Sequence, residues 1–293
     1  MNWLMSNKSF TLIELLVVIV IIGILAGVIM ISTSSSINKA NIAKLKVFSE
    51  SIKNNLMVDL VSEWKFDEGS GTIIKDSWGN NNGTLTNGIW SNENSCVSGN
   101  CLGFNTSTDY VTVPSNESLR VVDNLTLEAW INPTDWQENG VSMVNNSIYR
   151  FYHRLGNNIY FFYRIQEQAN PCDSSWSYWT GLIGYISENK FHHVVGIMEG
   201  TYMKLYIDGV LARENGTCFN GYTKSPSSMS NMVFGFTENS NKGILDEVKV
   251  YKQAITSLQV KQNYIAGLDL ILSRGIISKN EYNQRINELA YAK

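Results

Sequence analysis

The amino-acid sequence predicts a long N-terminal α-helix, then an all-β sandwich, then a short C-terminal helical hairpin. Three observations predict this order. An apolar run near the N-terminus continues with helical spacing to about residue 60, short alternating runs separated by Gly, Asn, Asp and Ser follow, and helical spacing returns after Tyr251. We expect a leader at 1–9, a helix at 10–60, a sandwich at 61–255 and a hairpin at 256–293.

The N-terminal run contains no charged or strongly polar residue from Leu15 to Ile31. With 10–16 added, it reaches the ~20 residues that a helix needs to cross a bilayer. Glu14 is the single ionisable group within it, and a carboxylate at that depth persists mainly where something pairs with it. We therefore expect a membrane helix in which Glu14 serves assembly. A secretory signal peptide fits less well, because no small-x-small cleavage site precedes a soluble start.

The residues around the start of this run form the motif Lys8-Ser9-Phe10-Thr11-Leu12-Ile13-Glu14-Leu15. It resembles the cleavage and methylation signal of type IV pilins and of type II secretion pseudopilins, although that family usually has Gly where this chain has Ser9. The resemblance implies that a prepilin peptidase cuts between Ser9 and Phe10 and that the new terminus is methylated. The amine of Phe10 can then neutralise Glu14 of a neighbouring subunit.

Helical spacing continues beyond the membrane run. The apolar residues that follow recur every three or four positions and share one face, so we expect a single helix of roughly 75 Å, at about 1.5 Å per residue. These residues are Ile42, Leu45, Phe48, Ile52, Leu56 and Leu60.

The composition indicates a folded head, and we do not expect it to bind nucleic acid. The 293 residues are 44% hydrophobic and 17% charged, and the net charge of −3 leaves no basic surplus. All four cysteines follow the membrane run, and an even number there fits disulfides in an oxidising compartment. By their spacing we favour the pairs Cys96–Cys101 and Cys172–Cys218 over the two alternative pairings.

Several runs in the middle of the chain alternate as strands do, at 125–131, 203–207 and 244–251, and Asp208-Gly209 reads as a hairpin turn. Regular short strands favour a sandwich. Segments in the same region resemble the laminin-G-like jellyroll of the concanavalin A-like lectin and glucanase superfamily. The matching segments are 64–71, 76–80, 110–114, 125–133, 191–194, 204–209 and 245–251.

Enzymatic activity is not expected of this head. Hydrolases of that superfamily place a Glu-x-Asp-x-x-Glu array on one strand, and no Glu of this chain has an Asp two residues later. The adjacent pairs Asp67-Glu68 and Asp246-Glu247 would point to opposite faces of a strand. Two carboxylates from distant strands could still meet, so a membrane-anchored glycoside hydrolase is the third functional interpretation.

A structural calcium site is implied by the same resemblance, because related jellyrolls join the first strand region to the last strand through this ion. The matching positions are Asp246, with Asp67, Asp76 or the Gly83 carbonyl as partners. The alternative is that these carboxylates cap turns. We interpret His192 and His193 as structural, because no zinc-like spacing accompanies them.

Aromatic residues near two of the cysteines form the candidate ligand-binding surface. Rings flanked by hydrogen-bonding groups stack well on sugars or anchor protein contacts, whereas the alternative is that these rings fill the sandwich core. The residues are Asp173, Trp176, Tyr178, Trp179, Asn220 and Tyr222.

The C-terminal segment reads as two helices, at 258–272 and 279–289, with Ser278 and Glu281 as a capping box. The hairpin either mediates contacts or packs onto the jellyroll.

The sequence as a whole predicts a pilin-like subunit, inserted in the bacterial cytoplasmic membrane by one helix, with an extracytoplasmic head that reaches the cell surface in a pilus. We expect a minor pilin that binds a glycan or a surface protein, with other pilin subunits and prepilin peptidase as partners. The alternative is a type II secretion pseudopilin whose head contacts cargo or partner subunits.

Overall fold

The computed structural model of the chain describes residues 12–13, 15–22, 59–122, 124–136, 140–154, 156–164, 179–215, 229–236 and 241–291. The chain divides into two compact units, residues 1–54 and residues 55–293. In the first unit, residues 12–13 and 15–22 are helical, as expected there. The rest of the predicted helix to residue 58, including Phe10 and Glu14, lies outside the described residues, as does the predicted leader with Ser9. Leu60, expected to be the last helical residue, is instead the first residue of a strand, Leu60–Trp64. No described helix is long and apolar enough to be a candidate membrane span.

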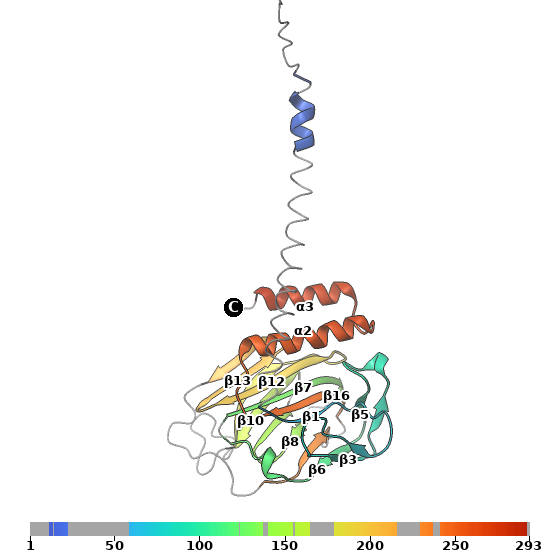
Figure 1. Cartoon of the computed structure of the whole chain (residues 1–293), viewed down its shortest axis with the longest axis vertical. Coiled ribbons are helices and arrows are strands. Elements are labelled where there is room, and N and C mark those ends of the chain that lie inside the picture. The colour runs from blue at the N-terminus through green and yellow to red at the C-terminus, as the bar shows by residue number, and fades with distance from the viewer. Residues whose placement is uncertain are drawn as a thin grey trace, which may run out of the picture. The chain divides into compact units, whose positions relative to one another are not determined.

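The second unit contains a sandwich of two antiparallel sheets, sheet A and sheet B (Figure 1). In order across sheet A the strands are β14 (Val210–Asn215), β13 (Tyr202–Ile207), β12 (His192–Glu199), β7 (Asn124–Asp135), β16 (Lys242–Tyr251), β5 (Cys101–Phe104) and β4 (Ile89–Ser91), and β1 (Leu60–Trp64) also pairs with β16. Sheet B runs β11 (Trp179–Tyr185), β10 (Asn158–Arg164), β9 (Tyr149–His153), β8 (Val141–Asn145), β15 (Met232–Gly235), β6 (Tyr110–Val113), β3 (Gly83–Thr86) and β2 (Ile73–Ile74). Two short 3-10 helices, η1 (Glu93–Ser95) and η2 (Glu117–Leu119), lie in the connections.

The core lies between the sheets and is rich in aromatic rings. Trp64, the last residue of β1, and Phe66, two residues later, both meet Phe234 of β15 edge-on, with ring centroids 4.9 and 5.9 Å from that of Phe234. All three side chains are fully buried. In β9, Tyr149 and Phe151 point into this core while the alternate residues, Arg150 and Tyr152, point outward, which is the period of two that a strand requires. The expected all-β sandwich is confirmed.

The predicted hairpin turn joins β13 to β14. Ile207 pairs with Val210, and Asp208 and Gly209 both have positive φ, 51° and 76°, as a two-residue turn of type I′ requires. The predicted strand runs fall within β7, β13 and β16. The adjacent acidic pairs differ from expectation: Asp67 and Glu68 lie in a turn, and Glu247 has a φ of 50° at an irregularity of β16. The expectation that the two carboxylates of each pair point to opposite faces of a regular strand therefore applies to neither pair.

The C-terminal helices α2 (Ser257–Ser273) and α3 (Lys279–Tyr291) form the expected hairpin and lie together beside β12, β13 and β7 (Figure 1). Thr256 and Gln259 make a full capping box before α2, which the sequence analysis missed. The predicted cap of α3 is present, because the amide of Glu281 donates to the hydroxyl of Ser278 at 3.1 Å. The hairpin belongs to the same compact unit as the sandwich.

The hairpin packs on the outer face of sheet A. The ring of Tyr264 on α2 stacks on Trp130 of β7, with centroids 5.8 Å apart, and Gly267 allows this approach because a Cβ there would lie 2.2 Å from the indole. Arg285 of α3 is buried and donates to the Phe191 carbonyl at 3.0 Å. Sheet A is thus covered on both faces, which explains why seven consecutive residues of β7, Leu125 to Ile131, are buried.

Candidate functional site

The candidate site is the outer face of sheet B over β9, β10 and β11. In the register of these strands, Phe162 lies opposite Arg150 on one side and Gly181 on the other. Tyr160 lies opposite Tyr152 in the same way. Because side chains alternate along a strand, these residues share one face, the one turned away from the core. We call this set, together with Trp179, the aromatic–arginine face.

Arg150 holds the centre of the aromatic–arginine face. Its guanidinium carbon lies 4.2 Å from the centroid of the Trp179 ring, 4.7 Å from that of Tyr152 and 5.2 Å from that of Phe162. Each distance is within the range of a cation–π contact. The rings of Tyr160 and Phe162 stack in parallel, with centroids 5.2 Å apart and an angle of 3° between their planes. The face is therefore an ordered array of rings around one cation.

Glycine at position 181 makes room for this array. A Cβ there would lie 2.2 Å from the Phe162 ring, closer than real atoms approach, so the ring lies over the bare backbone of β11. Flat rings beside a guanidinium can stack on the apolar side of a sugar ring or hold an anionic or aromatic group. The arrangement fits recognition of a ligand, and it needs no catalytic group.

Of the six predicted ligand residues, Trp179 is at the start of β11 on this face, half-buried and in contact with Arg150. Asp173, Trp176, Tyr178, Asn220 and Tyr222 lie outside the described residues. The sequence analysis missed the other members of the aromatic–arginine face. A signal for them was present: 149–153 and 158–164 place aromatic residues at both parities, so rings must emerge on the outer face as well as in the core.

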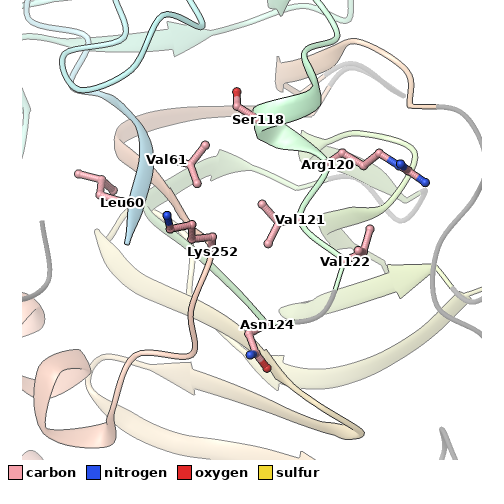
Figure 2. A pocket seen from close by; sticks show the side chains of 8 residues that line it. All are labelled: Leu60, Val61, Ser118, Arg120, Val121, Val122, Asn124 and Lys252. Atoms are coloured by element: carbon pink, nitrogen blue, oxygen red, sulfur yellow. The ribbon is translucent and has the colours of Figure 1, made fainter. Parts of the chain in front are cut away.

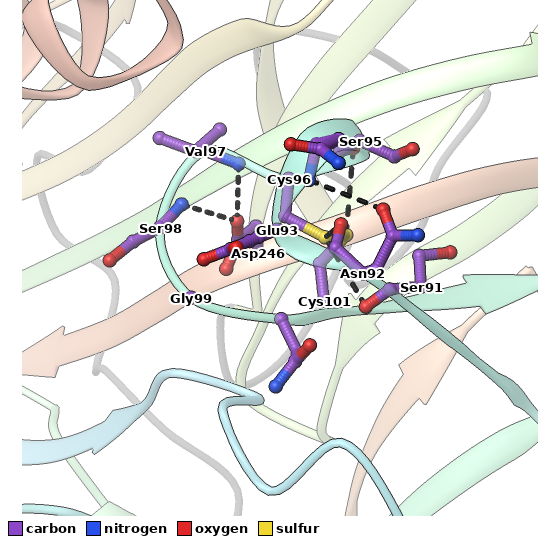
Figure 3. The surroundings of a disulfide bond; sticks show 12 residues. Ser91, Asn92, Glu93, Ser95, Cys96, Val97, Ser98, Gly99, Cys101 and Asp246 are labelled. Atoms are coloured by element: carbon purple, nitrogen blue, oxygen red, sulfur yellow. Dashed lines mark hydrogen bonds between the residues drawn. A yellow bond between two sulfur atoms is a disulfide. The ribbon is translucent and has the colours of Figure 1, made fainter. Parts of the chain in front are cut away.

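The Cys96–Cys101 disulfide is present, with Cα atoms 5.5 Å apart. The disulfide closes a short loop. The carboxylate of Asp246 in β16 binds this loop by accepting hydrogen bonds from the amides of Val97 and Ser98 at 2.8 and 3.1 Å (Figure 3). Cys172 and Cys218 lie outside the described residues. Arg274, which follows α2, donates to the carbonyl of Gly99 at 3.0 Å, so the hairpin also contacts this loop.

Two of the four predicted calcium ligands come together at the disulfide loop. Asp67 accepts from the amide of Asn100 at 3.0 Å, and Asp246 holds the same loop three residues earlier. Burial raises the pKa of Asp246 well above its usual range, and the negative charges of Glu247 and Asp67 raise it further. The second oxygen of Asp246, Oδ1, is buried and accepts no hydrogen bond from any described residue.

The other two predicted ligands lie elsewhere. Asp76 accepts four backbone hydrogen bonds at 2.8 to 3.2 Å, from the amides of Glu63, Trp78, Gly79 and Asn81, as a turn cap does. Gly83 is in β3 of sheet B, whereas Asp246 is in sheet A. Within the described ranges, no group of three or more His, Cys, Asp or Glu side chains is arranged to hold a metal ion.

His193 is part of the contact between sheet A and the hairpin. It is fully buried, and its Nε2 lies 3.0 Å from Oε1 of Glu128, whose other oxygen accepts from the Asn263 amide at 2.9 Å. Burial alone would raise the pKa of Glu128, but the charge of Lys249 and the hydrogen bond with His193 outweigh it and lower the pKa to about 2. The structural interpretation of His193 agrees with this geometry.

His192 lies between Asp208 and Ser187. Its Nδ1 is 2.7 Å from Oδ2 of Asp208 and its Nε2 is 2.9 Å from the Ser187 hydroxyl, the atoms that an acyl-transfer triad would use. The Ser187 amide, however, also donates to Nε2, at 3.1 Å. The imidazole therefore caps the turn through both groups of Ser187 and ties it to the β13–β14 hairpin.

Two family models match this chain. The model of the concanavalin A-like lectin/glucanases superfamily matches residues 105–261, and the model of the prokaryotic N-terminal methylation motif matches residues 4–30. No curated protein sequence matches the chain.

Several solved structures resemble the head in fold. The binding domain of Paraclostridial Mosquitocidal Protein 1 superposes with a TM-score of 0.59 at 16% identity, covering 73% of this chain and 53% of that one. The botulinum neurotoxin serotype D ligand binding domain in complex with N-acetylneuraminic acid gives 0.57 at 16% identity, covering 73% and 52%. The receptor binding domain of the botulinum neurotoxin C/D mosaic serotype gives 0.57 at 16%, covering 72% and 52%. This chain therefore spans about half the length of these domains.

The methylation motif indicates a type IV pilin-like, membrane-anchored and surface-exposed protein, and it implies assembly with other pilins and processing by a prepilin peptidase. The head has the fold of lectin-like binding domains. By its match over residues 105–261, more than half of its length, the chain belongs to the concanavalin A-like lectin/glucanases superfamily.

Proposed function

We propose that this chain is a minor type IV pilin whose head captures a glycan or a surface protein for adhesion. The observation that carries the proposal is the presence of a methylation motif at residues 4–30 and a concanavalin A-like head in one chain. The motif provides membrane anchoring and assembly, and the head provides the binding surface. We propose a role without catalysis, since Glu128, the glutamate of β7, lies buried beneath α2.

The ligand is expected to bind at the aromatic–arginine face. The outer face of sheet A is occupied by the hairpin, whereas the outer face of sheet B carries Trp179 and Tyr152 beside the Arg150 cation. Sugar rings present an apolar face that stacks on such side chains and hydroxyls that bond to their polar neighbours. The serotype D ligand binding domain, which shares the fold, was solved with N-acetylneuraminic acid, and this supports a glycan as the first ligand to test.

A glycan-array screen of the full chain in detergent micelles tests this proposal. We expect specific capture of a glycan class, lost when Trp179→Ala removes a ring of the face and kept when Tyr202→Ala removes an exposed ring of β13 in sheet A. Near-UV circular dichroism of both variants verifies that the head is folded. A folded protein that captures no glycan would overturn the glycan-binding role. A Trp179→Ala variant that binds as the wild type does would overturn the placement of the site on the aromatic–arginine face.

Assembly is proposed to proceed by cleavage between Ser9 and Phe10, after which the new terminus pairs with Glu14 of a neighbouring subunit. We expect Glu14→Ala to leave membrane insertion intact and to reduce incorporation into filaments, measured by immunoblot of sheared filaments against the membrane fraction. Thr11→Ala is the control, since it changes no charge. Incorporation of Glu14→Ala at the wild-type level would contradict the pairing.

A type II secretion pseudopilin is the second candidate, because the methylation motif resembles the signal of pseudopilins as well as that of pilins. In that role the head contacts exported cargo or partner subunits. The filament fraction distinguishes the two: recovery of this chain in long surface filaments supports the pilin, and recovery only with secretion-machine subunits supports the pseudopilin.

We propose that calcium, as an accessory ion, is held by Asp67 and Asp246 at the disulfide loop. The support is the second oxygen of Asp246, which is buried without a hydrogen bond from the described residues, and the nearby charges of Asp67 and Glu247. A hard cation would satisfy the oxygen and offset the repulsion between these carboxylates. Asp76 is not part of this proposal, because four amides already occupy its carboxylate.

A further inference from the structure

The turn between the two C-terminal helices is fixed to the sandwich through one arginine. We call this turn, residues 274–278, the elbow of the hairpin. The Nη1 of Arg274 donates to the carbonyls of Glu93 and Gly99, both at 3.0 Å. Among the described residues, these are the two hydrogen bonds that the elbow makes with the sandwich. Both acceptors belong to the connection between β4 and β5, so the elbow is held only where that connection has the right shape.

The Cys96–Cys101 disulfide sets the shape of this connection (Figure 3). β4 and β5 pair as far as Cys101, so without the disulfide residues 92–100 would form one open loop. The disulfide divides that loop by holding the Cα atoms of the two cysteines 5.5 Å apart, which removes conformations that the open loop would sample. Glu93 precedes the closed part of the loop and Gly99 lies within it. Their carbonyls therefore meet one guanidinium nitrogen when the two parts are held together.

The closed part of the loop packs tightly against the sandwich. Asp67 accepts from the amide of Asn100 at 3.0 Å, and the side-chain amide of Asn100 donates to the Asp67 carbonyl at 3.0 Å. Gly99 has a φ of 46°, and a Cβ at that position would overlap the Asp67 carboxylate. The position of the Gly99 carbonyl is thus determined by the closed loop, and the Arg274 contact depends on that position.

We propose that the Cys96–Cys101 disulfide is a redox latch that completes the docking of the C-terminal hairpin. While the two cysteines are thiols, the loop is open and the elbow is released, although α2 still packs on sheet A. When the disulfide forms, the carbonyls of Glu93 and Gly99 come together and Arg274 binds both of them. The latch does not depend on ligand capture, because it joins the hairpin to the β4–β5 connection and not to the aromatic–arginine face.

The latch closes by oxidation. Two electrons and two protons pass from the thiols of Cys96 and Cys101 to a disulfide donor, which becomes a dithiol, and the S–S bond forms between the two sulfur atoms. A surface-exposed protein meets oxidising surroundings only after its head has left the cytoplasm. Both cysteines are fully buried in the oxidised protein, so a reductant reaches the bond only when the loop opens locally. The latch therefore closes once, during export, and then remains closed.

A pocket of about 520 Å³ beside the start of β1 provides an internal reference region (Figure 2). No residue of the elbow or of the disulfide loop lines it. The segment that forms one of its walls is held from the core, where the hydroxyl of Tyr149 donates to the Leu119 carbonyl at 2.9 Å and that of Tyr163 donates to the Val122 carbonyl at 2.7 Å. Opening of the latch should therefore leave peptides that cover residues 118–122 unchanged.

Hydrogen–deuterium exchange of the full chain in detergent micelles tests the proposal. The amides of Arg274 and Ile276 close the last turn of α2 by donating to carbonyls of that helix at 3.1 and 3.0 Å. In the Cys96→Ser/Cys101→Ser variant, which represents the open latch, we expect these amides to exchange at least about tenfold faster than in the wild type, the factor that one charge-assisted hydrogen bond is worth. The reference peptides at 118–122 should exchange at the wild-type rate.

Arg274→Ala opens the same latch from the other side while the disulfide stays intact. It should accelerate exchange at the elbow as much as the cysteine variant does. Adding it to the cysteine variant should give no further acceleration, because both changes remove one contact. Arg213→Ala is the matched control, since it removes an exposed arginine of β14 and should change nothing at the elbow.

Three outcomes would overturn the latch. The first is wild-type exchange at the elbow in the folded cysteine variant or in Arg274→Ala. The second is an equal acceleration at residues 118–122, which would mean that the disulfide stabilises the whole head. The third is acceleration that adds up when the changes are combined, which would make the disulfide and the arginine independent. If the cysteine variant does not fold, folded wild type reduced with dithiothreitol replaces it, and unchanged exchange at its elbow would overturn the latch equally.

Discussion

The two outer faces of the sandwich carry similar side chains in different settings. On sheet A, Trp130 and His193 are buried beneath α2 and serve to dock the hairpin. On sheet B, Trp179 lies against Arg150 in a similar pairing of a ring with a nitrogen-bearing side chain, yet Trp179 keeps part of its surface exposed. The chemistry of a ring beside a polar group therefore does not by itself define a recognition surface. What distinguishes the two faces is which of them the C-terminal hairpin covers.

The largest expected effect is on the docked face. Tyr264→Ala removes a ring that stacks on Trp130 and His193, and it should lower the free energy of unfolding by about 3–5 kcal/mol, as large-to-small changes in a core do. Tyr185→Ala is the matched control on sheet B, because that ring is 68% exposed and its loss should change the stability by less than about 0.5 kcal/mol. Urea unfolding followed by tryptophan fluorescence measures both.

Equal stability of the two tyrosine variants would contradict this comparison. The docking contact of Tyr264 would then contribute no more to the free energy of unfolding than the exposed ring of Tyr185. A further check is whether a Tyr264→Ala protein that remains folded at low temperature still captures the glycan. Because Trp179 lies on the other sheet, that protein should keep ligand capture below its unfolding transition.

The strands of both faces were predictable, but the difference between the faces was not. Alternation placed 125–131 and 244–251 in strands, and Asp208-Gly209 in the turn, because these signals are local. That Trp130 meets Tyr264, or Arg150 meets Trp179, depends on strand register and on where a distant helix docks. Such contacts join residues 29 or more positions apart, and no local pattern specifies them.

The candidate site was predictable in part for the same reason. Trp179 is predicted as a ligand residue because it stands among aromatic residues near a cysteine, and it lies on the proposed face. Arg150 was overlooked, since an isolated arginine in a strand looks like a solvated charge. The calcium set shows the opposite case: Asp76 looked like a metal ligand, but its place in a tight turn directs four backbone amides at its carboxylate.

A smaller effect on the docked face comes from acid. The pKa of Glu128 is lowered from 4.5 to about 2 in the folded protein, where burial raises it and Lys249 and His193 more than offset this. A depressed pKa contributes stability that is present above pH 4.5 and lost as the pH falls toward 2, on the order of 3 kcal/mol. We expect Glu128→Gln to be less stable than the wild type at pH 7 and to lose less stability between pH 4.5 and 2.

Urea midpoints at several pH values measure this, with Glu117→Gln as the control because Glu117 is an exposed carboxylate. If the stability of the Glu128→Gln protein falls with acid as steeply as that of the wild type, the pair with His193 is not what links the docked face to pH.

On sheet B, the ring array can be disturbed without removing a ring. A Cβ at position 181 would lie 2.2 Å from Phe162, so Gly181→Ala should displace that ring from Arg150 and weaken ligand capture, at a stability cost of about 1–3 kcal/mol. Gly103→Ala is the control in β5, where the nearest atom would be 3.5 Å away. Capture that is unchanged in a folded Gly181→Ala protein would show that the ligand does not use the position of the Phe162 ring.

The smallest expected effect concerns the disulfide loop, which touches the docked side through Arg274. If calcium joins Asp67 and Asp246, EDTA should lower the Tm of the wild type by a few degrees, roughly the shift that ~1 kcal/mol produces. Asp246→Asn keeps the shape of the side chain and removes its charge, so its Tm should not respond to EDTA. An EDTA response that is equal in both proteins would place the ion elsewhere. No response in either would leave the buried Asp246 oxygen protonated, which its raised pKa allows, and the loop would then be held by the carboxyl group alone.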